Sequence, residues 1–150
     1  MTVEIDGQAA TAPALEAYDA VFDGSFERVL GTGAYNPAFI ADFYADFLSA
    51  SPFIKERFEQ TDMSAQRTML HDSLLLLIEF NRTRSADRRL RQLAEVHSRR
   101  GQDIPPEFYD LWLTSLVKAV AVHDPEFSDD VELAWRIALM PGITFMRFCY

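Results

Sequence analysis

Apolar residues recur every three or four positions along most of the chain, and no segment keeps the strict alternation of a half-buried strand. This periodicity predicts an all-α protein with six to eight helices joined by short loops. With no internal repeat and no shift in composition, residues 1–150 are expected to form one domain that begins with a loose segment over 1–13. The expected helices cover 15–31, 36–50, 51–58, 61–80, 85–101, 107–124 and 128–140.

Capping residues and helix breakers refine these boundaries. Ser85 is expected to cap the fifth helix, and Gly101 is expected to end it. Gly24 is expected to interrupt the first helix. Pro141 and Gly142 follow the last predicted helix directly, and proline lacks the N–H of a helix interior, so the pair should kink or break that helix.

Composition narrows the function classes. The 12 phenylalanines predict a wide aromatic interior, which either side chains fill or a flat apolar ligand occupies. A net charge of -9 and a pI near 4.7 argue against binding nucleic acid or an anionic membrane. The single Cys149 excludes an internal disulfide and a thiolate metal cage. The longest apolar run, at 74–78, is far too short to span a bilayer, so we expect a cytoplasmic protein.

His97 shares an apolar helix face with Leu90 and Leu93. A histidine in that position is either a hydrogen-bonded core residue or a ligand. The other histidines, His71 and His123, are not at metal-cage spacing with it, and H-E-x-x-H is absent. The chain also has no G-x-S-x-G, phosphate-binding glycine loop or paired-carboxylate signature. His97 by itself leaves both roles open.

Three segments read together resemble the globin superfamily. They are "FYADFLSASPFIKERF" (43–58), "DMSAQRTML" (62–70) and "LAEVHSRRG" followed by "IPPEFYDLW" (93–112). The likeness is to bacterial single-domain globins and to the globin part of flavohaemoglobins, and it covers roughly residues 16–148. It implies a globin fold, with helices packed three-over-three around a pocket for non-covalent haem b.

The resemblance also implies roles on the proximal side. His97 matches the proximal histidine that binds haem iron. Leu93 matches the residue whose carbonyl accepts a hydrogen bond from the other ring nitrogen and so raises the basicity of the ligand. Arg99 and Arg100 are candidates for pairing with the propionates, or else form a basic helix end favoured by the helix dipole. The further residues expected to contact haem are Phe58, Leu70, Tyr109 and Ile104.

On the distal side, Gln66 matches the residue that reaches over a bound gas, and Tyr44 matches a tyrosine that donates a hydrogen bond to it. The alternatives are an exposed helix residue for Gln66, and for Tyr44 a buried aromatic whose hydroxyl bonds a carbonyl. His71, five positions after Gln66, lies about 140° further round the helix and should not face the haem. A shift in register would instead make His71 an internal sixth ligand.

Three functions are compatible with the resemblance. The first is reversible binding of O2, with CO or NO as other ligands. The second is an NO dioxygenase that depends on a reductase in trans, and the third is a gas sensor that acts through a partner protein. Flavohaemoglobin-like globins carry a glutamate in the last helix. The matching place here is near Tyr150, and no acid follows Glu132, which disfavours the dioxygenase. We favour the binding protein, because every matched residue supports it and the other two functions require a partner.

Overall fold

The computed structural model describes residues 12–31 and 36–150, and in these ranges the chain forms seven α-helices and no strand. Most of the predicted loose segment, residues 1–11, lies outside the described residues. The all-α prediction is confirmed. The helices are α1 (Ala12–Leu30), α2 (Pro37–Ser49), α3 (Pro52–Arg57), α4 (Met63–Thr83), α5 (Arg88–His97), α6 (Glu107–His123) and α7 (Asp129–Phe148).

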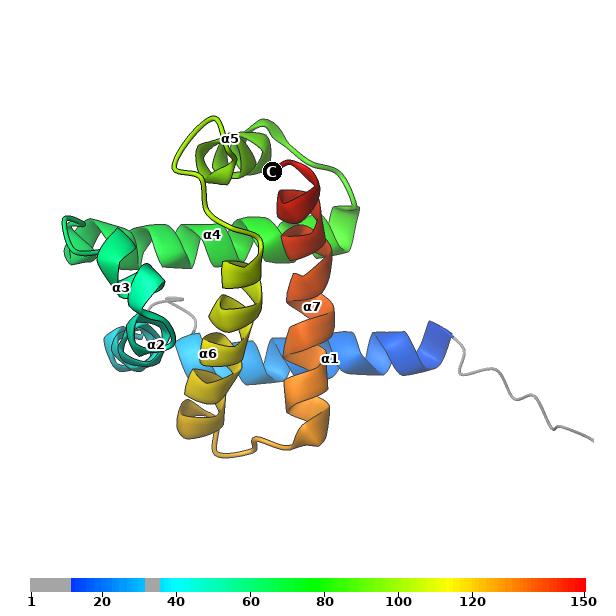
Figure 1. The fold of residues 1–150 in the computed structure, drawn as a ribbon. Coiled ribbons are helices and arrows are strands. Elements are labelled where there is room, and N and C mark those ends of the chain that lie inside the picture. Colours follow the sequence, from blue (N-terminus) through cyan, green and yellow to red (C-terminus); the bar gives the residue numbers. More distant parts are fainter. Residues whose placement is uncertain (1–11, 32–35) are drawn as a thin grey trace, which may run out of the picture.

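Six of the seven helices form two layers of three, with α1, α4 and α5 in one layer and α2, α6 and α7 in the other, and the short α3 packs beside α2. Within one layer α4 packs beside α5, and within the other α6 packs beside α2 and α7. Contacts between the layers join α1 to α6 and α7, and join α7 to α4 and α5. Figure 1 shows α6 and α7 side by side in front of α1, with the C-terminal part of α7 crossing α4. The three-over-three arrangement is therefore confirmed.

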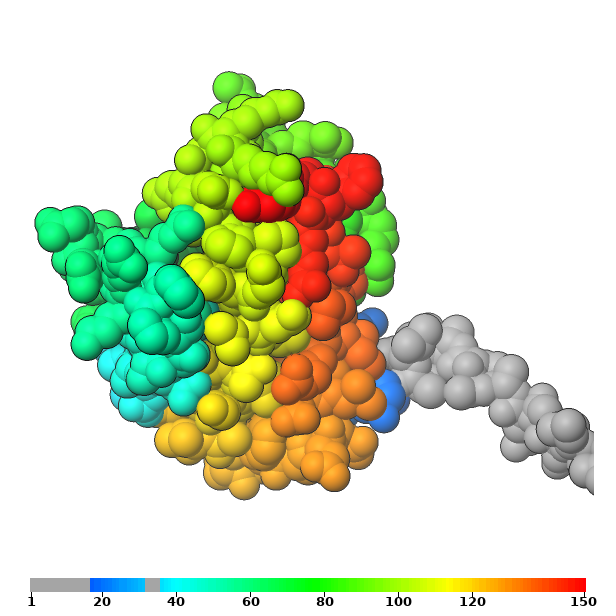
Figure 2. Space-filling model, in the orientation of Figure 1, coloured from blue at the N-terminus to red at the C-terminus, as the bar shows by residue number. Residues whose placement is uncertain are grey.

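One face of the molecule is built by α6 and α7. In Figure 2 their yellow and orange surfaces lie next to each other and face outward, with the end of α7 reaching the α5 region. No helix in the described ranges is long and apolar enough to cross a membrane.

Side-chain caps explain where several helices begin. The Asn36 side chain accepts hydrogen bonds from the N–H groups at the start of α2, and Ser51 and Asp62 do the same for α3 and α4. Helix α5 is capped by Asp87, whose carboxylate accepts from the N–H of Leu90, so the predicted cap at Ser85 is wrong. A carboxylate is as good a cap as a hydroxyl, and it stands closer to the first apolar turn.

The interruption predicted at Gly24 and a break at Pro141 and Gly142 do not occur. Helix α1 continues through Gly24, and α7 continues through Pro141 and Gly142. At Gly142 the backbones of α7 and α4 approach closely, because a Cβ there would lie 2.5 Å from Cδ2 and 3.2 Å from Cα of Leu77. Packing of α7 against α4 and α1 outweighs the local cost of the proline and the glycine.

The polar groups buried between α1 and the start of α7 form one network. The indole N–H of Trp135 donates to the Ser25 hydroxyl at 2.8 Å, and that hydroxyl donates to Asp124 at 2.6 Å. Arg28 donates to both oxygens of the Asp124 carboxylate. Each buried group is satisfied, as burial requires. The network fixes α1 against the α6–α7 connection.

Candidate functional site

A cavity of about 420 Å³ lies between the two layers of helices. This volume falls in the range of small-molecule pockets, roughly 300–1,000 Å³. Its walls are mainly apolar and aromatic, and polar side chains enter at a few points. The aromatic lining residues are Tyr44, Phe47, Phe58, Phe108, Tyr109 and Trp112. The polar ones are Arg57, Thr61, Gln66, Ser73, His97 and Gln102.

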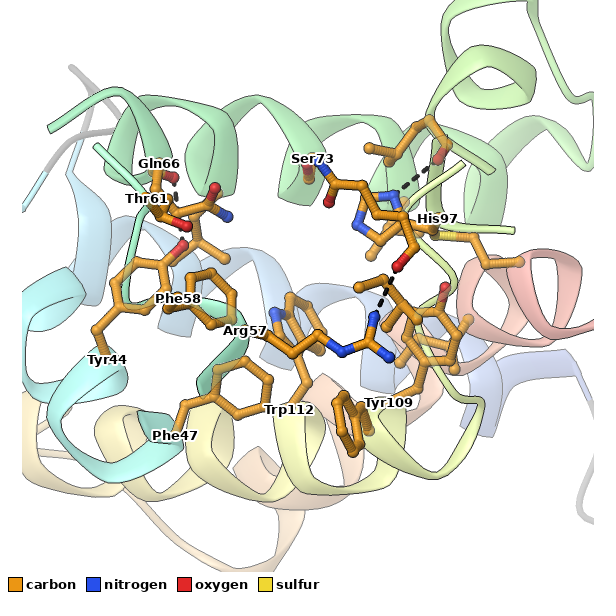
Figure 3. A pocket seen from close by; sticks show the side chains of 18 residues that line it. Tyr44, Phe47, Arg57, Phe58, Thr61, Gln66, Ser73, His97, Tyr109 and Trp112 are labelled. Carbon is orange, nitrogen blue, oxygen red and sulfur yellow. Dashed lines mark hydrogen bonds between the residues drawn. The ribbon is translucent and has the colours of Figure 1, made fainter. Parts of the chain in front are cut away.

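His97 is the last residue of α5, and its side chain lines the cavity. Its Nδ1 lies 2.8 Å from the carbonyl oxygen of Leu93, one turn earlier. A carbonyl only accepts hydrogen bonds, so Nδ1 carries the proton and Nε2 is left with a free lone pair. Figure 3 shows the second ring nitrogen turned into the cavity.

Burial lowers the pKa of His97, and the hydrogen bond to Leu93 opposes this shift only in part. The imidazole is therefore neutral at pH 7, which is the form that binds metals. The loop after α5 holds this position, because the N–H of Ile104 donates to the His97 carbonyl at 2.9 Å. Helix α5 ends here rather than at the predicted Gly101, where a side chain would collide with the backbone of Val96.

A second polar group lies on the opposite side of the cavity. Figure 3 shows Tyr44 of α2 and Gln66 of α4 together with Thr61 there, across from His97. The Tyr44 hydroxyl donates to the backbone carbonyl of Gln66 at 3.2 Å. Burial raises the pKa of Tyr44 to about 12, so the hydroxyl stays protonated at neutral pH. Of the two alternatives for Tyr44, the structure shows the hydroxyl bonded to a carbonyl.

The side chains of α4 follow the helical repeat that the sequence predicts. Gln66 and Leu70 line the cavity, and Ser73 and Leu77 continue the same face. Gln66 is half-buried rather than a fully exposed helix residue. His71 is absent from the lining and lies 3.3 Å from the Asp72 carboxylate through its Nδ1. The structure therefore places Gln66, and not His71, opposite His97.

The remaining predicted contacts divide into two groups. Phe58, Leu93, Ile104 and Tyr109 all line the cavity. Arg99 and Arg100 are exposed and lie outside its lining; the Arg99 guanidinium stands over the Tyr150 ring, 4.6 Å from the ring centroid.

Sequence reasoning missed several lining residues. Ser73 and Trp112 could have been predicted, because each lies three positions after a predicted pocket residue on the same helix. Arg57 and Gln102 reach the cavity from a short helix and a loop, where no periodicity operates. Ile143 and Met146 enter from the part of α7 beyond the predicted helix end.

The fold and the cavity together define an all-α protein with a buried pocket that presents one neutral imidazole. No family model matches the sequence, and no curated protein sequence matches it. A crystal structure does match, that of a protein from Pseudomonas aeruginosa PAO1 described as structurally highly homologous to a human haemoglobin. The sequences are 36% identical over 89% of this chain and 98% of that one, with a TM-score of 0.80. The chain belongs to the globin family.

Proposed function

We propose that this protein is a haem-binding globin that reversibly binds O2, with CO and NO as further ligands. The observation that carries the proposal is the His97–Leu93 pair, which leaves one imidazole nitrogen free in an aromatic cavity. A neutral imidazole whose second nitrogen donates to a carbonyl is the usual ligand arrangement for haem iron. The residues present fit non-covalent haem b.

Each part of the cavity has a separate task in this proposal. His97 is the protein ligand of the iron, and the Leu93 carbonyl fixes the ring orientation and tautomer. Phe58 and Tyr109 give apolar contact to the flat macrocycle. When bound, haem supplies the iron centre at which small diatomic gases bind.

Gln66 is the donor to a bound gas, because its side-chain amide lines the cavity opposite His97 and has two N–H donors. Tyr44 acts through Gln66. Its hydroxyl is bonded to the Gln66 carbonyl and so holds the first turn of α4 in place. Tyr44 is therefore a positioning residue.

The end of α7 does not favour the NO dioxygenase alternative. Burial raises the pKa of Tyr109 to about 12, and the positive charge of Arg147 in α7 opposes this shift. No acid follows Glu132 in the sequence. Tyr150, at the place matched to the flavohaemoglobin glutamate, donates to Asp103. Reversible gas binding needs neither this acid nor a reductase in trans.

The test is reconstitution with hemin, followed by absorption spectroscopy. The wild-type protein should develop a Soret band at one equivalent of hemin and bind CO after reduction. His97→Ala should lose most of its hemin on gel filtration. His123→Ala is the matched control, because His123 pairs with Asp42 outside the cavity lining and should keep full occupancy. Absence of a Soret band in the wild type, or full hemin retention by His97→Ala, contradicts the proposal.

A further inference from the structure

We propose that Arg57 is the carboxylate-binding residue of this pocket. It would pair with an acidic group on a ligand whose apolar body fills the cavity. The inference rests on the proposed function, in which that group is a haem propionate. The two cations that the sequence suggested for this task, Arg99 and Arg100, lie outside the cavity lining.

Arg57 stands where the cavity opens to the surface. It is the last residue of α3, and it lines both the cavity and a shallower outer groove that includes Phe53 and Pro105. The Arg57 guanidinium lies 6.0 Å from the centroid of the Phe108 ring, which also lines both hollows. Figure 3 shows the side chain extended across the cavity between the Tyr44 side and the His97 side. A ligand carboxylate at the mouth would lie within reach of this group.

The guanidinium is held by neutral partners alone. Its Nη1 donates to the backbone carbonyls of Gln102 and Asp103, each at 2.6 Å. Within 12–31 and 36–150, Arg57 forms no ion pair, and no bond from its Nε or Nη2 is found. This is notable in a chain with 23 acidic and 14 basic residues. The planar fork of donors suits a carboxylate, to which charge-assisted bonds are stronger than bonds to carbonyls.

The surroundings of Arg57 favour binding of a carboxylate on the side that faces the cavity. Among the described residues, Arg57 is the one lysine or arginine that lines the cavity. On its outer side it is flanked by Glu56 and Glu107, which line the groove and disfavour an anion there. The expected ligand class is therefore a flat, apolar molecule with an acid group at its edge.

The competing explanation is structural. By bonding Gln102 and Asp103, Arg57 ties α3 to the α5–α6 loop, and its loss would loosen the pocket for every ligand. Hemin and its dimethyl ester separate the two roles, because the ester keeps the macrocycle and iron but has no carboxylate. A residue that binds the carboxylate distinguishes these ligands, whereas one that only ties the loop does not.

The experiment measures release of hemin and of hemin dimethyl ester to excess apomyoglobin, from the wild type, Arg57→Gln and Arg57→Lys. Arg84→Gln is the control, since among the described residues the Arg84 side chain bonds only to neighbouring Asn81 and it lies outside the cavity lining. We expect Arg57→Gln to release hemin about tenfold faster, the size of one lost charge-assisted hydrogen bond, and to release the ester at the wild-type rate. Arg57→Lys keeps the charge without the fork and should fall between.

The other outcomes separate the carboxylate role of Arg57 from the binding of haem. Equal acceleration for hemin and ester, or none for either, removes the carboxylate role while leaving the haem proposal intact. A wild type that binds neither ligand removes both. Thermal melts of the apo variants show whether Arg57→Gln is folded. If it is unfolded, the release rate of hemin divided by that of the ester is compared between Arg57→Lys and the wild type. Equal ratios in the two proteins overturn the inference.

Discussion

The close approach of α7 to α4 makes Gly142→Ala an informative substitution. The new methyl carbon would lie 2.5 Å from Cδ2 and 3.2 Å from Cα of Leu77, and Leu77 is buried and lines the cavity. The Leu77 side chain would have to turn within a packed wall, and the two backbones would have to separate slightly. Overpacking of this kind costs about 1–3 kcal/mol. Replacing a helical glycine by alanine recovers up to about 1 kcal/mol of that cost.

Gly24→Ala is the matched control because it makes the same change inside α1. The added methyl there would meet Nη1 of Arg28 at 3.2 Å. This nitrogen pairs with the exposed Glu126 carboxylate, so it can shift by a few tenths of an ångström while Nε and Nη2 keep their bonds to Asp124. This variant should therefore be more stable than the wild type by about 0.5–1 kcal/mol. Subtracting the two effects removes the propensity gain and isolates the contact with Leu77, expected at about 1–3 kcal/mol.

Urea unfolding of the apo protein measures this difference directly. In thermal melts, a chain of this size shifts its Tm by about 2–4 °C for each kcal/mol, so Gly142→Ala should melt several degrees below Gly24→Ala. In a Leu77→Ala background the clash with Cδ2 disappears, and Gly142→Ala should then cost less. Equal stabilisation by both alanine substitutions would refute the close approach of α7 to α4.

Two further predictions concern polar groups. Tyr44→Phe removes the hydrogen bond to the Gln66 carbonyl. We expect it to lower the free energy of unfolding by about 1 kcal/mol, measured by urea titration. We also expect it to speed O2 release about fivefold, measured by CO replacement. No change in the release rate would contradict the positioning role of Tyr44. Asp124→Asn should lower stability by roughly 1–3 kcal/mol at pH 7. Burial alone would raise the pKa of Asp124, but the hydrogen bonds from Arg28, Ser25 and the Glu126 N–H outweigh it, and the pKa is lowered from 3.8. Because the folded pKa is depressed, this stability is complete above the unfolded value and is lost as the pH falls through the folded one. The difference in free energy of unfolding between the wild type and Asp124→Asn should therefore be constant from pH 7 to about pH 5 and shrink below pH 4, as urea midpoints would show. A difference that does not depend on pH would contradict this account.

Local features of the chain were sufficient to predict most of the helices and the helix faces that carry site residues, whereas the roles of those residues came from the resemblance to globins. Caps such as Asn36 act on N–H groups two or three residues away, so they can be predicted from the sequence. The same holds for His97 and Leu93, which face each other because they are four residues apart on one helix. The face of α4 that carries Gln66 and Leu70 follows from the helical repeat as well. Each of these relations spans one or two helical turns.

The tertiary structure decided the rest, because it depends on contacts between segments far apart in the chain. The partner of the Tyr44 hydroxyl is 22 residues away, and the carbonyls bound by Arg57 are 45 and 46 residues away. Pro141 and Gly142 were misread as an interruption because their local cost is visible in the sequence, whereas the packing of α7 against α4 that offsets it is not. The sequence by itself determined where the imidazole of His97 points relative to its own helix. Only packing of the two layers determined which cation, Arg57 rather than Arg99, stands at the mouth of the cavity.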